Sequence, residues 1–246
     1  MTFDYNQQQW NALGQLDPFW AMTGMSRWDL ADFFQTGRHQ VAQLHEEMQR
    51  LDYPRRFQRV LDFGCGIGRV APALREHFAE YIGLDVAESL ILKARELHRD
   101  LPNAQFLVNT ASRLDLPDHS IDLICSFGVF QHIPDQQAIL HLFSEFARVV
   151  APGGLIFTNV CHHIHWPYRL QLRRRAYTAL KRLGFPDHVL YNRFKLYPQS
   201  VHSIPLRLLY AHLQTLPLHV RVMRPQSSLD APHQLWEYAL TKAEIS

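Results

Sequence analysis

One stretch of this chain constrains its fold more than any other: a short apolar run that ends in closely spaced glycines. Val60–Arg69 reads Val-Leu-Asp-Phe-Gly-Cys-Gly-Ile-Gly-Arg, and Gly83–Asp85 follows it. This order predicts a buried strand, a glycine turn, a helix and a second strand that ends in an acid. Glycines let the backbone adopt positive φ and approach a ligand closely, and the helix directs free N–H groups into the same space. An adenosine-containing cofactor fits this arrangement, with two ribose hydroxyls bound to Asp85.

Two cofactor classes fit this outline, and the spacing of the glycines separates them. A dinucleotide site favours Gly-x-Gly-x-x-Gly, whereas here Gly68 comes one residue early and Arg69 stands at the third glycine position. The spacing Asp62-x-Gly64-x-Gly66-x-Gly68 instead resembles the first motif of the class I S-adenosylmethionine-dependent methyltransferases. A tight turn without a ligand is the remaining interpretation, and the motifs further along the chain argue against it.

The resemblance extends to about residue 160. Further strands are expected at Ala104–Val108 and Ile121–Ser126, and a helix with an apolar face follows them. The signature Arg-Val-x-x-Pro-Gly-Gly at Arg148–Gly154 is similar to a later motif of the same family and leads into the strand Leu155–Val160. The match therefore covers several separate elements in the order that the family requires.

The chain is thus predicted to have an α/β fold, with a doubly wound, seven-stranded, mostly parallel sheet whose last strand is antiparallel. Residues 1–52 are expected to form an N-terminal helical cap. Residues 53–246 are expected to form the methyltransferase domain, with a basic helical insertion at about 162–198 after the fifth strand. The elements expected after this insertion are a helix kinked at a proline and a two-stranded hairpin: Ser200–Leu213 with Pro205, Leu218–Val222 and Leu235–Leu240.

The resemblance also implies which residues bind the cofactor. It places Asp62 near the methionine end of S-adenosylmethionine and assigns the ribose to Asp85. Residues of the neighbouring turns and loops complete the predicted set: Gly64, Cys65, Gly66, Val86, Thr110, Ala111 and Phe127. The family usually carries an acid for the adenine amino group after the third strand, but here the sequence is Asn109-Thr110-Ala111. Adenine recognition is therefore expected to use weaker acceptors and the backbone.

The segment before the first strand contains a long amphipathic helix and many aromatic residues. Apolar residues recur at helical spacing over Leu30–Leu51. The aromatic residues before it either cover the cofactor and substrate, as such extensions do in the family, or pack on the core: Tyr5, Trp10, Phe19, Trp20 and Trp28. Gly37-Arg38 interrupts the helix pattern and resembles the N-terminal region of bacterial members. Arg38 is either the partner of the cofactor's methionine carboxylate, through two parallel hydrogen bonds, or a solvated surface arginine.

Charge is unevenly distributed along the chain. The formal net charge is +2, yet residues 162–224 contain eleven Lys or Arg and one acid, Asp187. On a helical wheel the start of this segment presents one broad apolar arc, and Arg169 and Arg173 fall inside it. Because a charge that faces inward is costly unless it is paired, these two arginines contact either an anionic substrate or a protein carboxylate.

The opposite face of the same predicted helix is basic: Arg174, Arg175, Lys181 and Arg182. It is either a solvated surface or a contact for an anionic membrane surface, an acidic carrier protein or nucleic acid. Nucleic acid is disfavoured, because it would require basic residues spread over the surface together with stacking aromatic residues.

The candidate catalytic residues follow the carboxyl ends of strands, where sites in open α/β sheets lie. His132, with Gln131 beside it, comes just after the fourth strand and is the first candidate for a general base. A helix cap is the alternative role for His132. Tyr168, His165 and Tyr5 are weaker candidates.

No metal site, disulfide or membrane span is expected from the sequence. His162, His163 and His165 lack metal-ligand spacing and a nearby acid. The three cysteines fall near predicted strand ends, which favours small buried residues. No apolar run approaches the roughly 18 residues of a membrane span, and the N-terminal residues lack the pattern of a signal peptide. These features favour a cytoplasmic protein.

The resemblance implies transfer of a methyl group to an oxygen or nitrogen of a small molecule in a biosynthetic reaction. An anionic acceptor would account for Arg169 and Arg173. Two alternatives keep the same fold and cofactor. One is a cyclase or lyase that consumes S-adenosylmethionine and releases methylthioadenosine, and the other is a cofactor-binding subunit without chemistry of its own.

Overall fold

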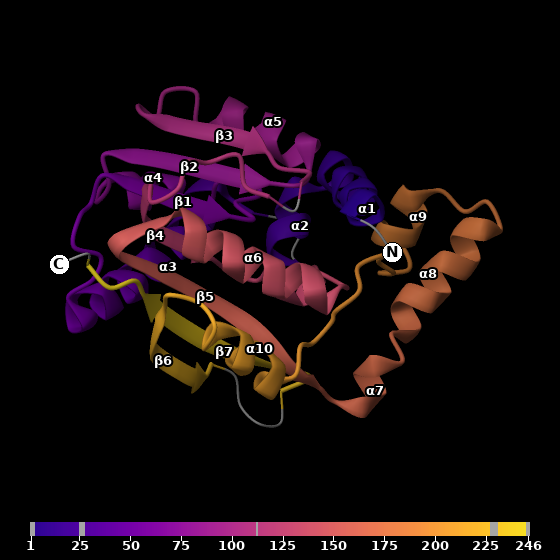
Figure 1. Ribbon diagram of the computed structural model, residues 1–246. Helices are drawn as coiled ribbons and strands as arrows, with labels where there is room; N and C mark the ends of the chain where they lie inside the picture. The colour runs from indigo at the N-terminus through magenta and orange to yellow at the C-terminus, as the bar shows by residue number, and fades with distance from the viewer. Residues whose placement is uncertain (1–2, 25–27, 112, 227–230, 245–246) are drawn as a thin grey trace.

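A computed structural model describes residues 3–24, 28–111, 113–226 and 231–244. Over these ranges the chain forms one seven-stranded sheet in the order β3-β2-β1-β4-β5-β7-β6 (Figure 1). Strand β7 runs antiparallel to both of its neighbours, and the other pairs are parallel. The strands are β1 (Arg59–Phe63), β2 (Glu80–Asp85), β3 (Ala104–Val108), β4 (Ile121–Ser126), β5 (Val150–Ile164), β6 (His219–Pro225) and β7 (His233–Thr241). The predicted fold class is confirmed.

Helices cover both faces of this sheet. Those described are α1 (Phe3–Leu16), α2 (Pro18–Thr23), α3 (Leu30–Leu51), α4 (Ala71–Arg75), α5 (Glu88–Leu97), α6 (Gln136–Val149), α7 (Trp166–Arg169), α8 (Leu172–Arg182), α9 (Asp187–Asn192), α10 (Leu206–Leu213) and a 3₁₀ turn, η1 (Phe130–His132). Helices α3, α4 and α5 pack on one face, and α6 and α10 pack on the other.

Alternation along the strands produces the two cores. On β4, Leu123 and Cys125 point into the cluster with α3, α4 and α5, whereas Ile124 points into the cluster with α6 and α10. Successive side chains of a strand face opposite sides of a sheet, so a strand covered on both sides is mostly apolar. All six residues of β4 are buried, as this position in the middle of the sheet requires.

The strand order reverses between β1 and β4. From β1 the chain moves outward through β2 to β3, and it then returns to place β4 on the other side of β1. Ligands of open α/β sheets bind beyond the carboxyl ends of the strands at such a switch point. The turns after β1, β2 and β4 therefore define where the site must lie.

Two helical segments differ from the sequence-based expectation. The helix expected at 200–213 begins only at Leu206, and Pro205 is its N-cap. Proline lacks an N–H and disfavours helix in the residue before it, so it starts this helix rather than kinking it. The insertion forms separate short helices instead of one long helix, because Gln171 adopts a left-handed conformation with φ of 47°.

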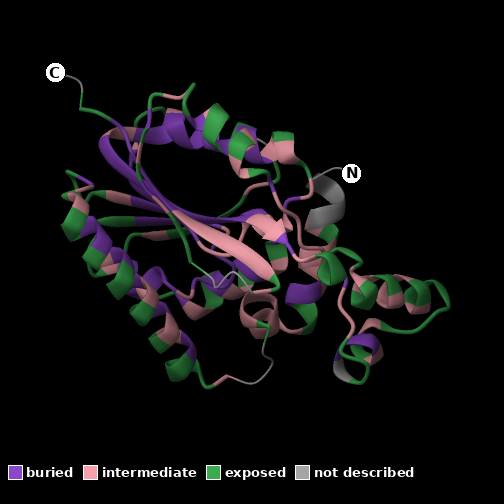
Figure 2. Ribbon diagram, turned by 90° about the horizontal axis from the view of Figure 1, so that it is seen from below, coloured by how far each residue is buried: buried purple, intermediate pink, exposed green. Residues whose placement is uncertain are grey.

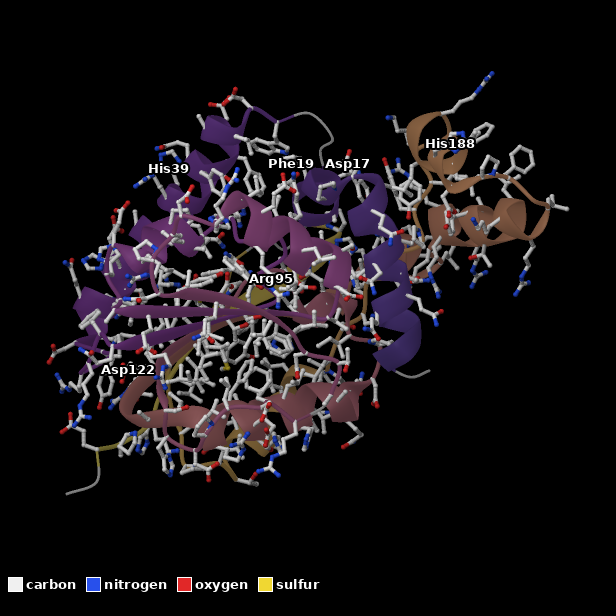
Figure 3. All side chains as sticks on the ribbon, turned by 90° about the horizontal axis from the view of Figure 1, so that it is seen from above. Asp17, Phe19, His39, Arg95, Asp122 and His188 are labelled. Atoms are coloured by element: carbon white, nitrogen blue, oxygen red, sulfur yellow. The ribbon has the colours of Figure 1, made fainter. Side chains whose placement is uncertain are left out.

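Residues 165–197, which contain α7, α8 and α9, form a projection that we call the arm (Figure 1). Figure 2 shows α8 coloured exposed or intermediate along its length, and none of its residues is buried. In Figure 3 the labelled His188 lies on the arm, apart from the sheet, and Asp17 and Phe19 mark α2 on the side that faces the arm. The ring of Trp20 in α2 stacks on the ring of Tyr197 with 3.8 Å between centroids, and this contact joins the arm to α2.

The three cysteines, Cys65, Cys125 and Cys161, are free and buried. In the described part of the chain, no helix is both long enough and apolar enough to cross a membrane. The same residues contain no group of His, Cys, Asp and Glu side chains that could hold a metal ion.

Candidate cofactor and active site

The glycine turn after β1 forms the floor of a pocket. Gly64, Gly66 and Gly68 have φ of 78°, 54° and 77°, a region that side chains rarely allow. A Cβ on Gly64 would overlap Val129, and a Cβ on Gly66 would overlap Met22. The glycines therefore serve two purposes, because they permit the turn and they leave room for the side chains of Val129 and Met22 to pack closely on it.

Asp85, the last residue of β2, holds this turn and faces the pocket. Its Oδ2 accepts a hydrogen bond from the N–H of Gly66 at 2.8 Å, and its Oδ1 accepts one from the N–H of Ala87 at 2.9 Å. Burial raises the pKa of Asp85, and the backbone donors partly counteract this. Each carboxylate oxygen retains a further lone pair, so the carboxylate can accept hydrogen bonds from two ribose hydroxyls.

Several predicted cofactor residues line the pocket together with His132: Gly64, Gly66, Asp85, Val86 and Phe127. Most of the remaining lining is apolar, as in Leu84 and Leu90, which suits an adenine ring. Among the described residues, no Lys or Arg lines the pocket. These residues come from the ends of β1, β2 and β4, as the switch point predicts.

The residue after β3 that faces the pocket is Asn109, not Thr110 or Ala111. Thr110 and Ala111 are exposed, and the structure does not support their predicted cofactor contacts. Asn109 is positioned by two hydrogen bonds: its N–H donates to the carbonyl of Asp85 at 2.9 Å, and its Nδ2 donates to the carbonyl of Ala111 at 3.1 Å. Asn109 follows β3, where the family usually carries an acid for the adenine amino group, and its amide Oδ1 is a hydrogen-bond acceptor.

Asp62 and Cys65 lie beneath the pocket rather than in its lining. The Oδ2 of Asp62 accepts a hydrogen bond from the hydroxyl of Tyr81 at 2.7 Å, and its Oδ1 accepts a weak one from the thiol of Cys125 at 3.9 Å. The side chain of Cys65 is buried against Gly83. Both predicted cofactor contacts are therefore corrected, because these side chains point into the sheet layer and support the turn from below.

His132 reaches the pocket from η1, the turn after β4. Its Nδ1 lies 3.1 Å from the carbonyl oxygen of Ser200. Because a carbonyl only accepts, Nδ1 carries the proton and Nε2 keeps its lone pair. Burial lowers the pKa of His132 to about 4, so the ring is neutral at pH 7. Gln131 contributes an amide nitrogen 3.5 Å from Nε2, at the edge of hydrogen-bonding distance.

Helices α1 and α2 cover the pocket, and each contributes one residue to its lining. Trp10 of α1 lines the pocket and meets His132 edge-on, with 5.0 Å between ring centroids. Met22 of α2 also lines it, and its Sδ lies 3.1 Å from the N–H of Ile67 in the glycine turn. Helix α2 starts with the N-cap Asp17, whose Oδ1 accepts from the N–H of Trp20, and with a proline in its first turn.

The other aromatic residues of the cap have structural roles. Phe19 and Trp28 pack around Phe33 in a small separate core, and Trp20 contacts the arm. The two interpretations of this aromatic stretch thus hold for different residues of it. No sequence motif predicts that Met22 lines the pocket, because a single methionine belongs to no recognisable pattern. The side chain of Tyr5 lies outside the described residues.

Of the two interpretations of Arg38, the structure favours the surface arginine. Its guanidinium is half-exposed and forms an ion pair with Glu76 at 2.5 Å, outside the pocket lining. The neighbouring Gly37 explains the interrupted pattern, because a Cβ there would overlap the backbone carbonyl of Arg69. The glycine thus marks a close approach of α3 to the turn, and the arginine after it faces solvent.

The candidates in the insertion also lie outside the pocket. Tyr168 is exposed and packs against His233, and His165 precedes α7 beyond the end of β5. Arg169 and Arg173 are exposed instead of facing inward, and the Nε of Arg169 donates to the carbonyl of Ile164 at 2.8 Å. None of these four side chains lines the pocket, because β5 continues to residue 164 and carries the insertion past it.

Comparison with known proteins agrees with this geometry. Residues 60–154 match a family model described as a methyltransferase domain. The chain is 34% identical over 140 residues to a ubiquinone biosynthesis O-methyltransferase of Neisseria meningitidis, an alignment that covers 53% of this chain and 55% of that protein. It is 31% identical over 126 residues to phosphoethanolamine N-methyltransferase 3 of Arabidopsis thaliana, covering 49% of this chain and 25% of that protein. The chain thus spans between a quarter and about half of the length of these curated relatives.

The fold has solved counterparts. Magnesium protoporphyrin IX methyltransferase from Synechocystis, solved with bound SAH (S-adenosylhomocysteine), superposes with a TM-score of 0.64 and 15% identity, covering 98% of this chain and 99% of that one. This likeness concerns the fold. The sequence matches add the methyltransferase motifs, and the pocket adds the glycine turn and Asp85 in their expected places. Over residues 60–154 the chain therefore matches a methyltransferase domain, and its motifs and fold are similar to those of the class I S-adenosylmethionine-dependent methyltransferases.

Proposed function

We propose that this protein transfers the methyl group of S-adenosylmethionine to a hydroxyl or amine of a small molecule, with His132 as the general base. The observation that carries the proposal is the hydrogen bond from Nδ1 of His132 to the carbonyl of Ser200, made within the same pocket as Asp85. It directs a neutral nitrogen acceptor to the region beyond the carboxyl ends of β1 and β4.

The residues of the pocket fit the cofactor. Gly64 and Gly66 expose their backbone to the pocket, where it can approach a ligand closely, and Asp85 offers its carboxylate to the ribose. When bound, S-adenosylmethionine supplies a methyl group that is already activated on a sulfonium. The protein therefore has to align the acceptor and remove its proton. Nε2 of His132 would take that proton, while Trp10 holds the ring from the side.

The character of the lining supports an acceptor that is uncharged at its reacting end. Among the described residues the lining has no Lys or Arg, and Arg169 and Arg173 lie exposed on the arm. A buried anion without a cationic partner would be costly. The two relatives are named as an O-methyltransferase and an N-methyltransferase, which supports oxygen or nitrogen as the acceptor atom.

The test is to replace the base and leave the cofactor site intact. His132→Asn should lower the rate of methyl transfer by about 10²–10⁴-fold, the usual contribution of a general base. The binding constant for S-adenosylmethionine, measured by calorimetry, should change little. Activity is measured by mass spectrometry with a panel of phenols, alcohols and amines as acceptors. His141→Asn, at an exposed position of α6, is the matched control.

A first incubation with S-adenosylmethionine alone separates this proposal from its main alternative. If the cofactor remains intact without an acceptor, methyl transfer stands and the acceptor panel follows. Accumulation of methylthioadenosine in the absence of any acceptor would instead identify a cyclase or lyase and would refute the proposal.

A further inference from the structure

We propose that the arm, residues 165–197, docks this protein onto an anionic membrane surface. The inference is independent of the proposed methyl transfer, because it concerns a surface outside the pocket. It starts from an unusual concentration of exposed apolar side chains. Seven of the fourteen large hydrophobic side chains described as exposed lie on this one segment. The most exposed of all are Leu183, at 75%, and Trp166, at 73%.

The apolar stripe of α8 faces outward. Leu172, Ala179 and Leu183 are spaced to lie on one side of the helix, and all three are exposed. Tyr177 lies on the opposite side, and its hydroxyl donates to Asp187 of α9 at 2.7 Å. The polar tyrosine therefore packs inward while Leu172 and Leu183 face solvent, the reverse of the usual arrangement on a surface helix.

Basic side chains border this stripe on both sides. Arg175 and Arg182 flank it on one side and Arg173 on the other, and all three are exposed. None of them forms an ion pair within the described residues. An apolar stripe between rows of arginines is the pattern of a helix that lies in the plane of a membrane interface, where guanidinium groups reach lipid phosphates.

The charge of the arm selects the class of lipid. The arm contains eight Lys or Arg and a single acid, Asp187. That carboxylate is already engaged, since Lys181 pairs with it at 2.7 Å. The arm thus has a strongly positive surface without a free carboxylate, which attracts the anionic lipids of a membrane.

A second copy of the chain is a poorer occupant than a membrane. Pairing two arms through their apolar stripes would bring Arg173, Arg175 and Arg182 of each copy against their counterparts, and like charges across an interface are repulsive. An acidic protein would satisfy the arginines but would not require the exposed Trp166, a residue type enriched at membrane interfaces.

Flotation with lipid vesicles tests the proposal on the full chain. The protein should float with vesicles of phosphatidylcholine and phosphatidylglycerol, and it should bind at least tenfold more weakly to vesicles of phosphatidylcholine alone. Added salt should release part of the bound protein, because the attraction between exposed charges is screened. Equal binding to both kinds of vesicle, or binding to neither, would overturn the proposal.

Variants then locate the contact. Leu172→Ser with Leu183→Ser should reduce vesicle binding at least tenfold, whereas Leu92→Ser, at an exposed leucine of α5, should leave it unchanged. Arg175→Gln with Arg182→Gln should weaken binding to the anionic vesicles, with Arg56→Gln, at another exposed arginine, as its control. Thermal unfolding confirms that each variant is folded.

Two further measurements address the other occupants. Comparison with Trp166→Phe identifies the part of the fluorescence emission that comes from Trp166. In the unmodified protein, this part of the emission should shift to shorter wavelength when anionic vesicles are added. Sedimentation equilibrium without lipid reports the oligomeric state. A dimer that the Leu172→Ser and Leu183→Ser changes dissociate would assign the stripe to a second copy and would refute membrane docking.

Discussion

Two aspartates on neighbouring strands, Asp62 and Asp85, have different tasks because their surroundings differ. Asp85 faces the pocket and uses its carboxylate to hold the backbone of the glycine turn. Asp62 lies under that turn, with the hydroxyl of Tyr81 as its main partner. Burial raises the pKa of Asp62 to about 6, from 3.8 for an aspartate in water. The carboxylate of Asp62, at the start of the glycine motif, is thus a structural group whose ionised form is disfavoured by burial.

The pH dependence of stability should reveal this burial. Between pH 3.8 and about 6 the unfolded chain releases the proton of Asp62 while the folded chain retains it, so this residue lowers stability as pH rises. Asp62→Asn removes that effect. The stability of the variant relative to the unmodified protein should therefore be higher at pH 7 than at pH 4, as measured by denaturant unfolding. A difference that is independent of pH would contradict the assignment.

Asp118 is the control for the direction in which stability changes with pH. Arg148 lies 2.6 Å from Asp118 and lowers its pKa. The ionised form of Asp118 then favours folding, a contribution that is present at neutral pH and is lost as pH falls below 3.8. Asp118→Asn should consequently lose more stability at pH 7 than at pH 3, the opposite trend to Asp62→Asn.

At the scale of elements, α3 and the glycine turn form one unit. Gly37 lets the helix touch the backbone at Arg69, and the side chain of Arg69 bonds back to Gln40 and Thr36 on the same helix. The turn that shapes the pocket floor is therefore held from the outside by α3. This contact also explains why a glycine stands in the middle of an amphipathic helix, where it lowers helix stability by about 1 kcal/mol relative to alanine.

Gly37→Ala tests this contact. The higher helix propensity of alanine would stabilise α3, but the added Cβ would overlap the carbonyl of Arg69. We expect a net destabilisation of about 1–3 kcal/mol, typical of overpacking in a rigid site, measured by denaturant unfolding. Gln35→Ala, at an exposed position of the same helix, should be neutral or stabilising. A stabilised Gly37→Ala protein would show that α3 does not depend on this close approach.

At the scale of the whole molecule, cofactor binding should couple to global stability. The pocket is assembled from the ends of β1, β2, β3 and β4 and from helices α1, α2 and α5. A ligand that binds only the folded state at 100 times its Kd adds about 2.7 kcal/mol, which for a domain of this size raises Tm by about 5–10 °C. S-adenosylhomocysteine should produce this shift in differential scanning calorimetry.

Asp85→Ala should abolish most of that shift, because it removes the carboxylate for the ribose and the acceptor for the Gly66 N–H. Asp115→Ala, at an exposed acid outside the lining, should retain it. An unchanged shift in Asp85→Ala would refute the assignment of Asp85 to the ribose.

The parts of this protein that the sequence predicted well are those governed by local physics. The bounds of α3, the strands of the sheet and the turn with Gly64, Gly66 and Asp85 follow from hydrophobic periodicity and from the φ values that glycine permits. Each of these properties belongs to a few neighbouring residues. The order of the motifs along the chain was then sufficient to indicate the family and the cofactor.

Tertiary structure alone decided what comes together from distant segments. The approach of α2 to the turn brings Met22 over Gly66, and the length of β5 carries Tyr168 and Arg169 away from the pocket. The helical wheel treated the start of the insertion as one helix with an inward apolar arc, whereas the helix is broken at Gln171 and Leu183 of α8 faces solvent. Periodicity specifies which side chains share a face. Only the packing of one element on another specifies what that face meets.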